Sequence, residues 1–190
     1  TGYLSGIVAG LTTKVNQVAL VGPIDGGDAA RYNRGFVLGV QASNPKAKIR
    51  VTHIGNFNDT VKSGEAAQAF IQGGADVLTG SSQQALGALR AVADYPDKDI
   101  WWVGQDIAQI DIPEGYKCIA ASAYNYKAVV VGECLPMNFN NGGFIWKWNE
   151  AKCADKITPE IRTAVENQIK LFTETPNILS NWASVDYSTL

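Results

Sequence analysis

Short apolar runs alternate with helix-like segments along most of this 190-residue chain. Apolar runs predict strands at 17–22, 49–54, 76–79, 99–103, 117–123 and 144–148. Helix-like segments are predicted at 3–11, 28–43, 60–72, 82–93, 126–134 and 158–173. Strands joined by helical crossovers pair in parallel, and a continuous apolar run is typical of a strand buried on both faces. We therefore predict an α/β fold, in which helices cover both faces of a parallel sheet.

Local signals predict where two of these helices begin. Ser81, with Gln84 three residues later, forms a capping-box pattern before the fourth helix. Thr158 followed by Pro159 predicts an N-cap and a first-turn proline for the last helix. Residues 175–190 are interpreted as a tail that crosses to another part of the protein.

Composition excludes several classes of protein. A chain that is 46% hydrophobic with a net charge of −2 is too apolar and too weakly charged for intrinsic disorder. The same charge gives no basic face for DNA or RNA, so no nucleic-acid partner is expected.

The most apolar stretch, 3–11, is about half the ~20 residues that cross a bilayer. We interpret it as a buried helix whose Gly6 and Gly10 permit close packing, and its position at the start of the chain indicates that sequence precedes it.

The cysteines and the single histidine predict no metal site. Cys118, Cys134 and Cys153 form no CxxC pair, and His53 lies far from them in the sequence. Cys134 and Cys153 can meet across a loop, which would leave Cys118 unpaired or bonded to a segment outside this chain. Alternatively, all three are buried thiols that pack as small hydrophobic groups. We interpret His53, inside an apolar strand, as a core histidine.

The carboxyl ends of the predicted strands carry the polar groups of the chain. In open α/β sheets, ligands bind beyond these ends. Four of the predicted ends carry glycine, and the loops supply amides, hydroxyls, a carboxylate and aromatic rings: 55–59, 80–84, 104–106 and 124–125. Such groups suit a neutral polar ligand with a flat face.

Enzyme and cofactor motifs are missing from the sequence. It contains no GxSxG elbow, no GxxxxGK[ST] phosphate loop and no HExxH zinc motif. Residues 22–27 (GPIDGG) differ from the dinucleotide-binding GxGxxG pattern, and Pro23 stands where the tight turn is needed. No residue near Asp106 in the sequence is spaced to act with it as a general acid–base pair. Asp59 is explained as the N-cap of the following helix. We expect neither catalysis nor a cofactor.

Five stretches, in this order and spacing, resemble the basic membrane protein (BMP) family. They are GYLSGIVAGL at 2–11, RGFVLG at 34–39, IGNFND at 54–59 with GE at 64–65, GADV at 74–77 and VGQD at 103–106. The family consists of substrate-binding lipoproteins of ABC transporters, several of which bind purine nucleosides. The resemblance implies a Rossmann-like sheet of the type 1 periplasmic-binding fold. It also implies an extracellular or periplasmic protein, anchored to the membrane only through segments outside this chain.

Members of the family have two lobes, and the chain crosses between them. The resemblance assigns residues 1–16 to a helix of an otherwise missing N-terminal lobe. It assigns residues 17–125 to the C-terminal ligand-binding lobe, and residues 126–190 to crossover helices and a tail. This chain would then supply half of the walls of a ligand cleft.

The sequence departs from the nucleoside-binding members at two positions. The resemblance implies a second acid two residues after Asp106 and a lysine after the next strand, where this chain has Ala108 and Tyr124. Each lost charge-assisted hydrogen bond is worth ~1.5–3 kcal/mol. A nucleoside is therefore a candidate ligand and no more. The residues that we expect to form the cleft wall are Phe57, Ser82, Gln83, Asp106 and Tyr124.

Two functions follow from these observations. The first is an extracytoplasmic solute-binding protein that recognises a small polar ligand, with a transporter permease or a receptor as its partner. The alternative is a ligand-free structural or receptor ectodomain that uses the fold for protein–protein contacts. Most of the five tryptophans are expected in the core, and any exposed ones would form the partner surface. Asn58-Asp59-Thr60 is an N-glycosylation sequon. A glycan on Asn58 would obstruct the cleft and favour the alternative.

Overall fold

The computed structural model describes residues 1–126, 138–175 and 179–190. Cys134 and nearly all of the helix predicted at 126–134 lie outside these residues. The strands form one sheet of order β2-β1-β3-β4-β5-β6, in which β1 to β5 are parallel and β6 is antiparallel to β5. Their bounds are β1 (Gln17–Gly22), β2 (Lys48–His53), β3 (Val77–Gly80), β4 (Trp101–Gly104), β5 (Cys118–Tyr124) and β6 (Phe144–Trp148). The predicted strands and the parallel α/β sheet are confirmed.

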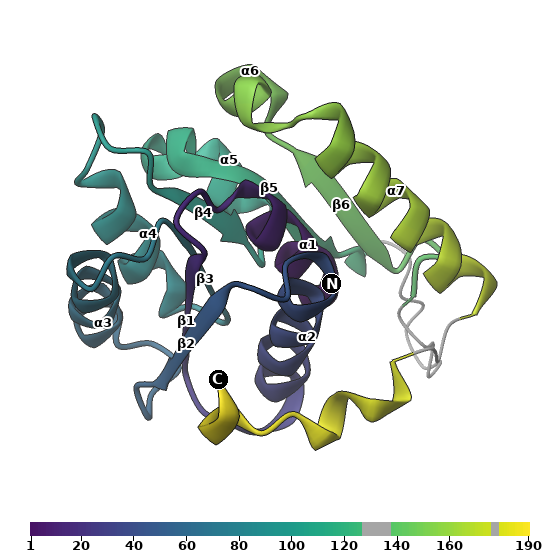
Figure 1. The fold of residues 1–190 in the computed structure, drawn as a ribbon, viewed down its shortest axis with the longest axis horizontal. Helices are drawn as coiled ribbons and strands as arrows, with labels where there is room; N and C mark the ends of the chain where they lie inside the picture. The colour runs from purple at the N-terminus through teal and green to yellow at the C-terminus, as the bar shows by residue number, and fades with distance from the viewer. Residues whose placement is uncertain (127–137, 176–178) are drawn as a thin grey trace.

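Helices cover both faces of this sheet (Figure 1). The α-helices are α1 (Gly2–Thr12), α2 (Gly27–Ser43), α3 (Thr60–Gln72), α4 (Ala85–Ala93), α5 (Ala108–Asp111), α6 (Glu150–Cys153) and α7 (Pro159–Glu174). Short 3₁₀ helices add η1 (Pro113–Lys117), η3 (Ala154–Lys156), η4 (Ser180–Ser184) and η5 (Tyr187–Thr189). The short elements α5 and η1, between β4 and β5, were not predicted from the sequence.

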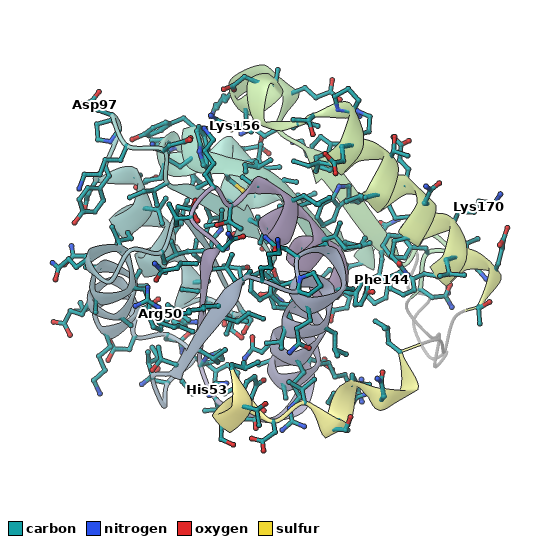
Figure 2. The ribbon with its side chains drawn as sticks, in the orientation of Figure 1. Arg50, His53, Asp97, Phe144, Lys156 and Lys170 are labelled. Carbon is teal, nitrogen blue, oxygen red and sulfur yellow. The ribbon has the colours of Figure 1, made fainter. Side chains whose placement is uncertain are left out.

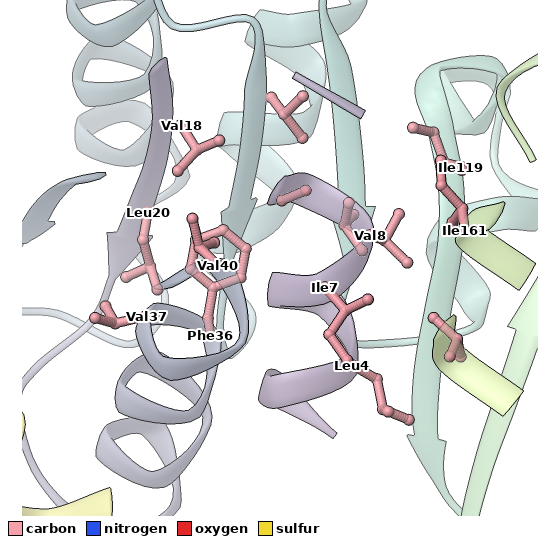
Figure 3. Packing of buried hydrophobic residues seen from close by; sticks show 14 of the residues in the cluster. Leu4, Ile7, Val8, Val18, Leu20, Phe36, Val37, Val40, Ile119 and Ile161 are labelled. Carbon is pink, nitrogen blue, oxygen red and sulfur yellow. The ribbon is translucent and has the colours of Figure 1, made fainter. Parts of the chain in front are cut away.

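The side chains of β1 show how one strand serves two cores. Val18 and Leu20 belong to the cluster that contains Phe36 of α2 together with residues of α1 and α7. Figure 3 shows this packing. Ala19 and Val21 point to the opposite face, into the cluster formed with α3 and α4. Both faces of the strand are buried, which explains why its sequence is continuously apolar.

The glycines of α1 let it pack directly on the backbone of α2. A Cβ atom on Gly6 would lie 2.2 Å from the Phe36 carbonyl oxygen, and one on Gly39 would lie 2.1 Å from the Tyr3 carbonyl oxygen. The prediction of a buried, closely packed helix is confirmed. The resemblance placed residues 1–16 in another lobe, but α1 packs here in the core of this sheet, against α2 and α7. The lobe boundaries at residues 17 and 126 stay a prediction.

Of the two predicted helix starts, one is confirmed and one is wrong. The Thr158 hydroxyl accepts a hydrogen bond from the Ile161 backbone N–H at 3.3 Å, as expected of an N-cap. The capping box before α4 does not form, because Ser82 adopts a left-handed backbone with φ +67°. The Gln84 side-chain amide instead donates to the Ser81 carbonyl at 2.8 Å. As a result, α4 begins only at Ala85.

The sequence predicted a tail that crosses to another part of the protein, but residues 179–190 stay against α2. Figure 1 shows them running across α2 and ending beside β2, and contacts between η4 and α2 hold them there. Among the described residues, no helix has the length and apolar character that crossing a bilayer would need.

Cys118 and Cys153 are buried free thiols. The Cys153 thiol donates to the Tyr116 carbonyl at 3.3 Å, and burial raises the pKa of Cys153 to about 11. Burial also raises the pKa of the more deeply buried Cys118.

We expect Cys153 in the native protein to react with iodoacetamide about a hundredfold more slowly than in urea, because only the thiolate attacks. Mass spectrometry of the alkylated peptides measures this ratio, and equal rates in both states would contradict the packing.

Candidate functional site

The sheet changes winding direction between β1 and β3. Helix α2 lies on one face of the sheet and connects β1 to β2. Helix α3 lies on the opposite face and connects β2 to β3, which pairs with β1 on the edge of β1 that β2 does not occupy. At such a switch point, the loops that follow the two strands separate and leave a crevice beyond their carboxyl ends.

A cavity of about 870 Å³ lies at this carboxyl edge, beyond β3, β4 and β5. Its walls include all five residues predicted for the cleft: Phe57, Ser82, Gln83, Asp106 and Tyr124. The structure thus brings together side chains from three loops and from the end of β5. Whether they bind a ligand stays a prediction.

Two hydrogen bonds tie the loops of the cavity wall together. The Ser82 backbone N–H donates to the Gln105 side-chain oxygen at 2.6 Å, which joins the loops after β3 and β4. The Gln84 backbone N–H donates to the Phe57 carbonyl at 2.8 Å, which joins the loops after β2 and β3. A left-handed non-glycine residue such as Ser82 costs ~1–3 kcal/mol and persists where the surroundings hold it. The wall is therefore preorganised.

Asp106 presents a carboxylate to the cavity. Its Oδ1 accepts a hydrogen bond from the Ala108 backbone N–H at 2.9 Å, which orients the side chain. Within the described part of the chain, Asp106 forms no ion pair, and its Oδ2 accepts no hydrogen bond. One carboxylate oxygen is therefore available to a ligand donor such as a hydroxyl or an amine.

Aromatic rings form the side of the cavity at the end of β5. The ring centroid of Tyr124 lies 5.2 Å from that of Phe144 and 6.0 Å from that of Tyr126. Burial, with a smaller effect from the charge of Asp28, raises the pKa of Tyr124. Its hydroxyl therefore stays protonated at neutral pH and can donate a hydrogen bond. Exposed faces of such rings can stack on a flat ligand. Phe57, 42% exposed, supplies a second aromatic surface.

Sequence reasoning missed part of this cavity. Ile107 and Gln109 line it from the loop and short helix after β4, and Asp28 borders it from the first turn of α2. The VGQD stretch drew attention to Asp106, but no pattern in the sequence predicted the single turn of α5 that follows. A smaller pocket of about 310 Å³ adjoins the cavity and shares Asp28 and Tyr124 with it.

Three other predicted features have clear positions. Asp59 is the N-cap of α3, and its Oδ1 accepts from the Lys62 backbone N–H at 2.9 Å, as expected. His53 is half-buried at the end of edge strand β2, so the prediction of a core histidine is wrong. Asn58 is exposed in the loop before α3, and its glycosylation stays a prediction. The part of the chain that the structure describes holds no group of three or more potential metal ligands.

Residues 1–147 match the model of a family described as ABC transporter substrate-binding protein PnrA-like. The chain belongs to this family. The resemblance to the BMP family is thereby confirmed, and the PnrA-like family consists of substrate-binding proteins.

Relatives of this PnrA-like chain include two bacterial proteins. It is 35% identical over 136 residues to the CD4+ T-cell-stimulating antigen of Listeria innocua, covering 69% of this chain and 37% of that protein. It is 28% identical over 114 residues to the ABC transporter nucleoside-binding protein BmpA of Lactococcus lactis, covering 56% of this chain and 32% of that protein. The matched part of the chain thus spans about a third of the length of these two relatives.

A solved structure supports the fold. An ABC transporter solute-binding protein from Conexibacter woesei matches with a TM-score of 0.74 at 21% identity, over 91% of this chain and 60% of that one. The periplasmic-binding-protein-like fold expected from the resemblance is confirmed.

Proposed function

We propose that this chain supplies one wall of the ligand cleft in an extracytoplasmic solute-binding protein, which delivers a small polar solute to an ABC-transporter permease. The observation that carries the proposal is the meeting of five predicted residues around one cavity, at the carboxyl edge of the sheet. Membership in a family of substrate-binding proteins supports a binding role for that cavity.

We propose a nucleoside as the ligand. The rings of Phe57 and Tyr124 offer faces on which a base can stack, and the available oxygen of Asp106 can accept a sugar hydroxyl. The cavity of about 870 Å³ falls within the ~300–1,000 Å³ typical of small-molecule sites. The name of the Lactococcus lactis relative, a nucleoside-binding protein, supports the same class of solute.

Ala108 stands where the nucleoside-binding pattern has a second acid, and this difference is compatible with binding. Ala108 offers no second carboxylate, but its backbone N–H orients Asp106. We therefore propose that recognition of hydroxyl groups depends on Asp106 alone, with the protonated Tyr124 hydroxyl as a neutral donor.

Thermal-shift screening of the complete protein against a panel of nucleosides tests the proposal. A ligand present at about 100 times its dissociation constant stabilises the folded state by ~2.7 kcal/mol, so at least one nucleoside should raise the melting temperature. Stabilisation by a different class of polar solute would keep the binding role and overturn the choice of nucleoside. No stabilisation by any solute would favour the ligand-free ectodomain.

A further inference from the structure

The last residues of the chain, 179–190, pack against the sheet as a strap. We call this segment the C-terminal strap. It lies outside the part of the chain that matches the family model, which ends at residue 147. In Figure 1 the strap crosses α2 and ends beside β2, and Figure 2 shows His53 next to it. Its Trp182 ring lies 5.8 Å from the Arg31 guanidinium, its Val185 and Tyr187 pack against the cluster around Phe36, and its other contacts include Arg34 and His53.

Arg34 joins the strap to the loop between β1 and α2. Its Nη1 donates to the Ala183 carbonyl of the strap at 2.7 Å, and its guanidinium lies 5.7 Å from the centre of the Tyr187 ring. Its Nε and Nη2 donate to the two carboxylate oxygens of Asp25 at 3.2 and 2.7 Å. Asp25 belongs to the loop that leads into Asp28 at the cavity. One side chain thus connects the strap with a loop of the cavity rim.

His53 joins the strap to a second loop of the cavity. The Tyr187 ring packs edge-on against the His53 ring at 5.2 Å between centroids. On its other side, His53 Nε2 lies 3.4 Å from the side-chain nitrogen of Asn33, whose oxygen accepts from the Ser81 hydroxyl at 2.8 Å. Asn33 and Ser81 are fully buried, and Ser81 directly precedes Ser82 in the cavity wall.

This arrangement suits a neutral His53 ring. With the Asn33 oxygen accepting from the Ser81 hydroxyl, the Asn33 side-chain nitrogen faces His53 and donates to Nε2, the acceptor nitrogen of a neutral ring. A protonated ring would turn a second N–H toward that nitrogen. It would also place a positive charge near Arg34.

We propose that the C-terminal strap is an acid-released clasp, which holds the loops on the cavity side in place while His53 is neutral and detaches when His53 is protonated. The charged and titratable groups that face His53 are Asp25, Arg34 and Tyr187. Asp25 would favour protonation, but both of its oxygens are engaged by Arg34. Tyr187 stays neutral, because burial raises its pKa.

The pH window follows from the direction of the His53 shift. Burial lowers the pKa of His53 below its ordinary value near 6.5. The strapped state is therefore fully favoured above about pH 6.5 and loses stability as the pH falls below that value, because the released state binds the proton first. His53 is the only histidine of the chain, so no other side chain here has an ordinary pKa between about 5 and 8.

Hydrogen exchange of the complete protein, resolved by mass spectrometry of its peptides, tests the clasp. After correction for intrinsic rates, we expect the strap peptide to exchange faster near pH 5 than near pH 7.5, because the released state binds the proton more tightly than the strapped state. The peptides that contain Asp25 and Ser81 should show a smaller increase over the same interval. His53→Gln, which does not titrate, should remove the pH dependence, whereas Tyr187→Phe should keep it because the ring remains.

Two results would overturn the clasp. One is equal protection of the wild-type strap at both pH values. The other is an undiminished pH response in the His53→Gln variant. If that variant does not fold, Tyr187→Ala provides the second test: it removes the ring that senses His53, so its strap should exchange rapidly at both pH values. A protected strap in Tyr187→Ala would also contradict the proposal.

Discussion

Replacing Gly39 by alanine is expected to destabilise the protein by about 3 kcal/mol, the upper end of the cost of overpacking. The added Cβ would lie 2.1 Å from the Tyr3 carbonyl oxygen and 2.9 Å from its carbon, which are backbone atoms of α1. Neither atom can move without shifting α1 in the core. The ~1 kcal/mol by which alanine is favoured over glycine in helices does not offset this clash.

Gly64→Ala is the matched control for this substitution. It lies in α3, and the nearest atom to its added Cβ would be the Gly87 carbonyl oxygen at 3.4 Å, an ordinary contact. Gly64→Ala should therefore be neutral or stabilising by up to ~1 kcal/mol. Urea titrations followed by circular dichroism measure both variants. Equal midpoints for Gly39→Ala and Gly64→Ala would show that α1 and α2 are not in backbone contact.

Asp106→Ala is expected to weaken nucleoside binding by about 10- to 100-fold. This factor corresponds to the ~1.5–3 kcal/mol of a hydrogen bond to a charged group. Asp106 has one carboxylate oxygen oriented by Ala108 and the other available to a ligand, so its loss removes the acceptor without breaking an ion pair of the described residues. The fold should be unaffected, because Asp106 is exposed at the cavity.

Asp97→Ala serves as the control for charge. Asp97 is an exposed carboxylate that precedes β4, at the opposite edge of the sheet from the cavity (Figure 2). Isothermal titration of adenosine into the complete protein should give wild-type affinity for Asp97→Ala and a clear loss for Asp106→Ala. An Asp106→Ala variant that binds adenosine as tightly as wild type would remove this residue from the binding site.

Much of the fold was predictable because hydrophobic periodicity is a local property. The bounds of β1 and α3 agree with the prediction to the residue, since apolar runs and caps mark both ends. The start of α4 was predicted wrongly because Ser82 is held in a left-handed conformation by Gln105, 23 residues away in the sequence. The path of residues 179–190 likewise depends on distant contacts with Arg34 and His53, which no local pattern reveals.

The candidate site was predictable for a different reason. Parallel strands bring their carboxyl ends to one edge, so the sequence alone predicts that residues at the ends of separate strands lie together. This rule found Phe57 and Tyr124, which lie 67 positions apart by residue number. It could not find Asp28 or Gln109, because their approach to the cavity depends on how α2 and α5 pack.

Photolabelling tests most directly whether this cavity is the ligand site. Irradiation of the complete protein with 8-azidoadenosine, followed by peptide mapping, should label the loops at 55–59, 82–86, 105–109 and 124–126. Excess unlabelled adenosine should suppress that labelling. Competable labelling of this chain confined to other surfaces, such as α7 or the amino edge of the sheet, would contradict the assignment.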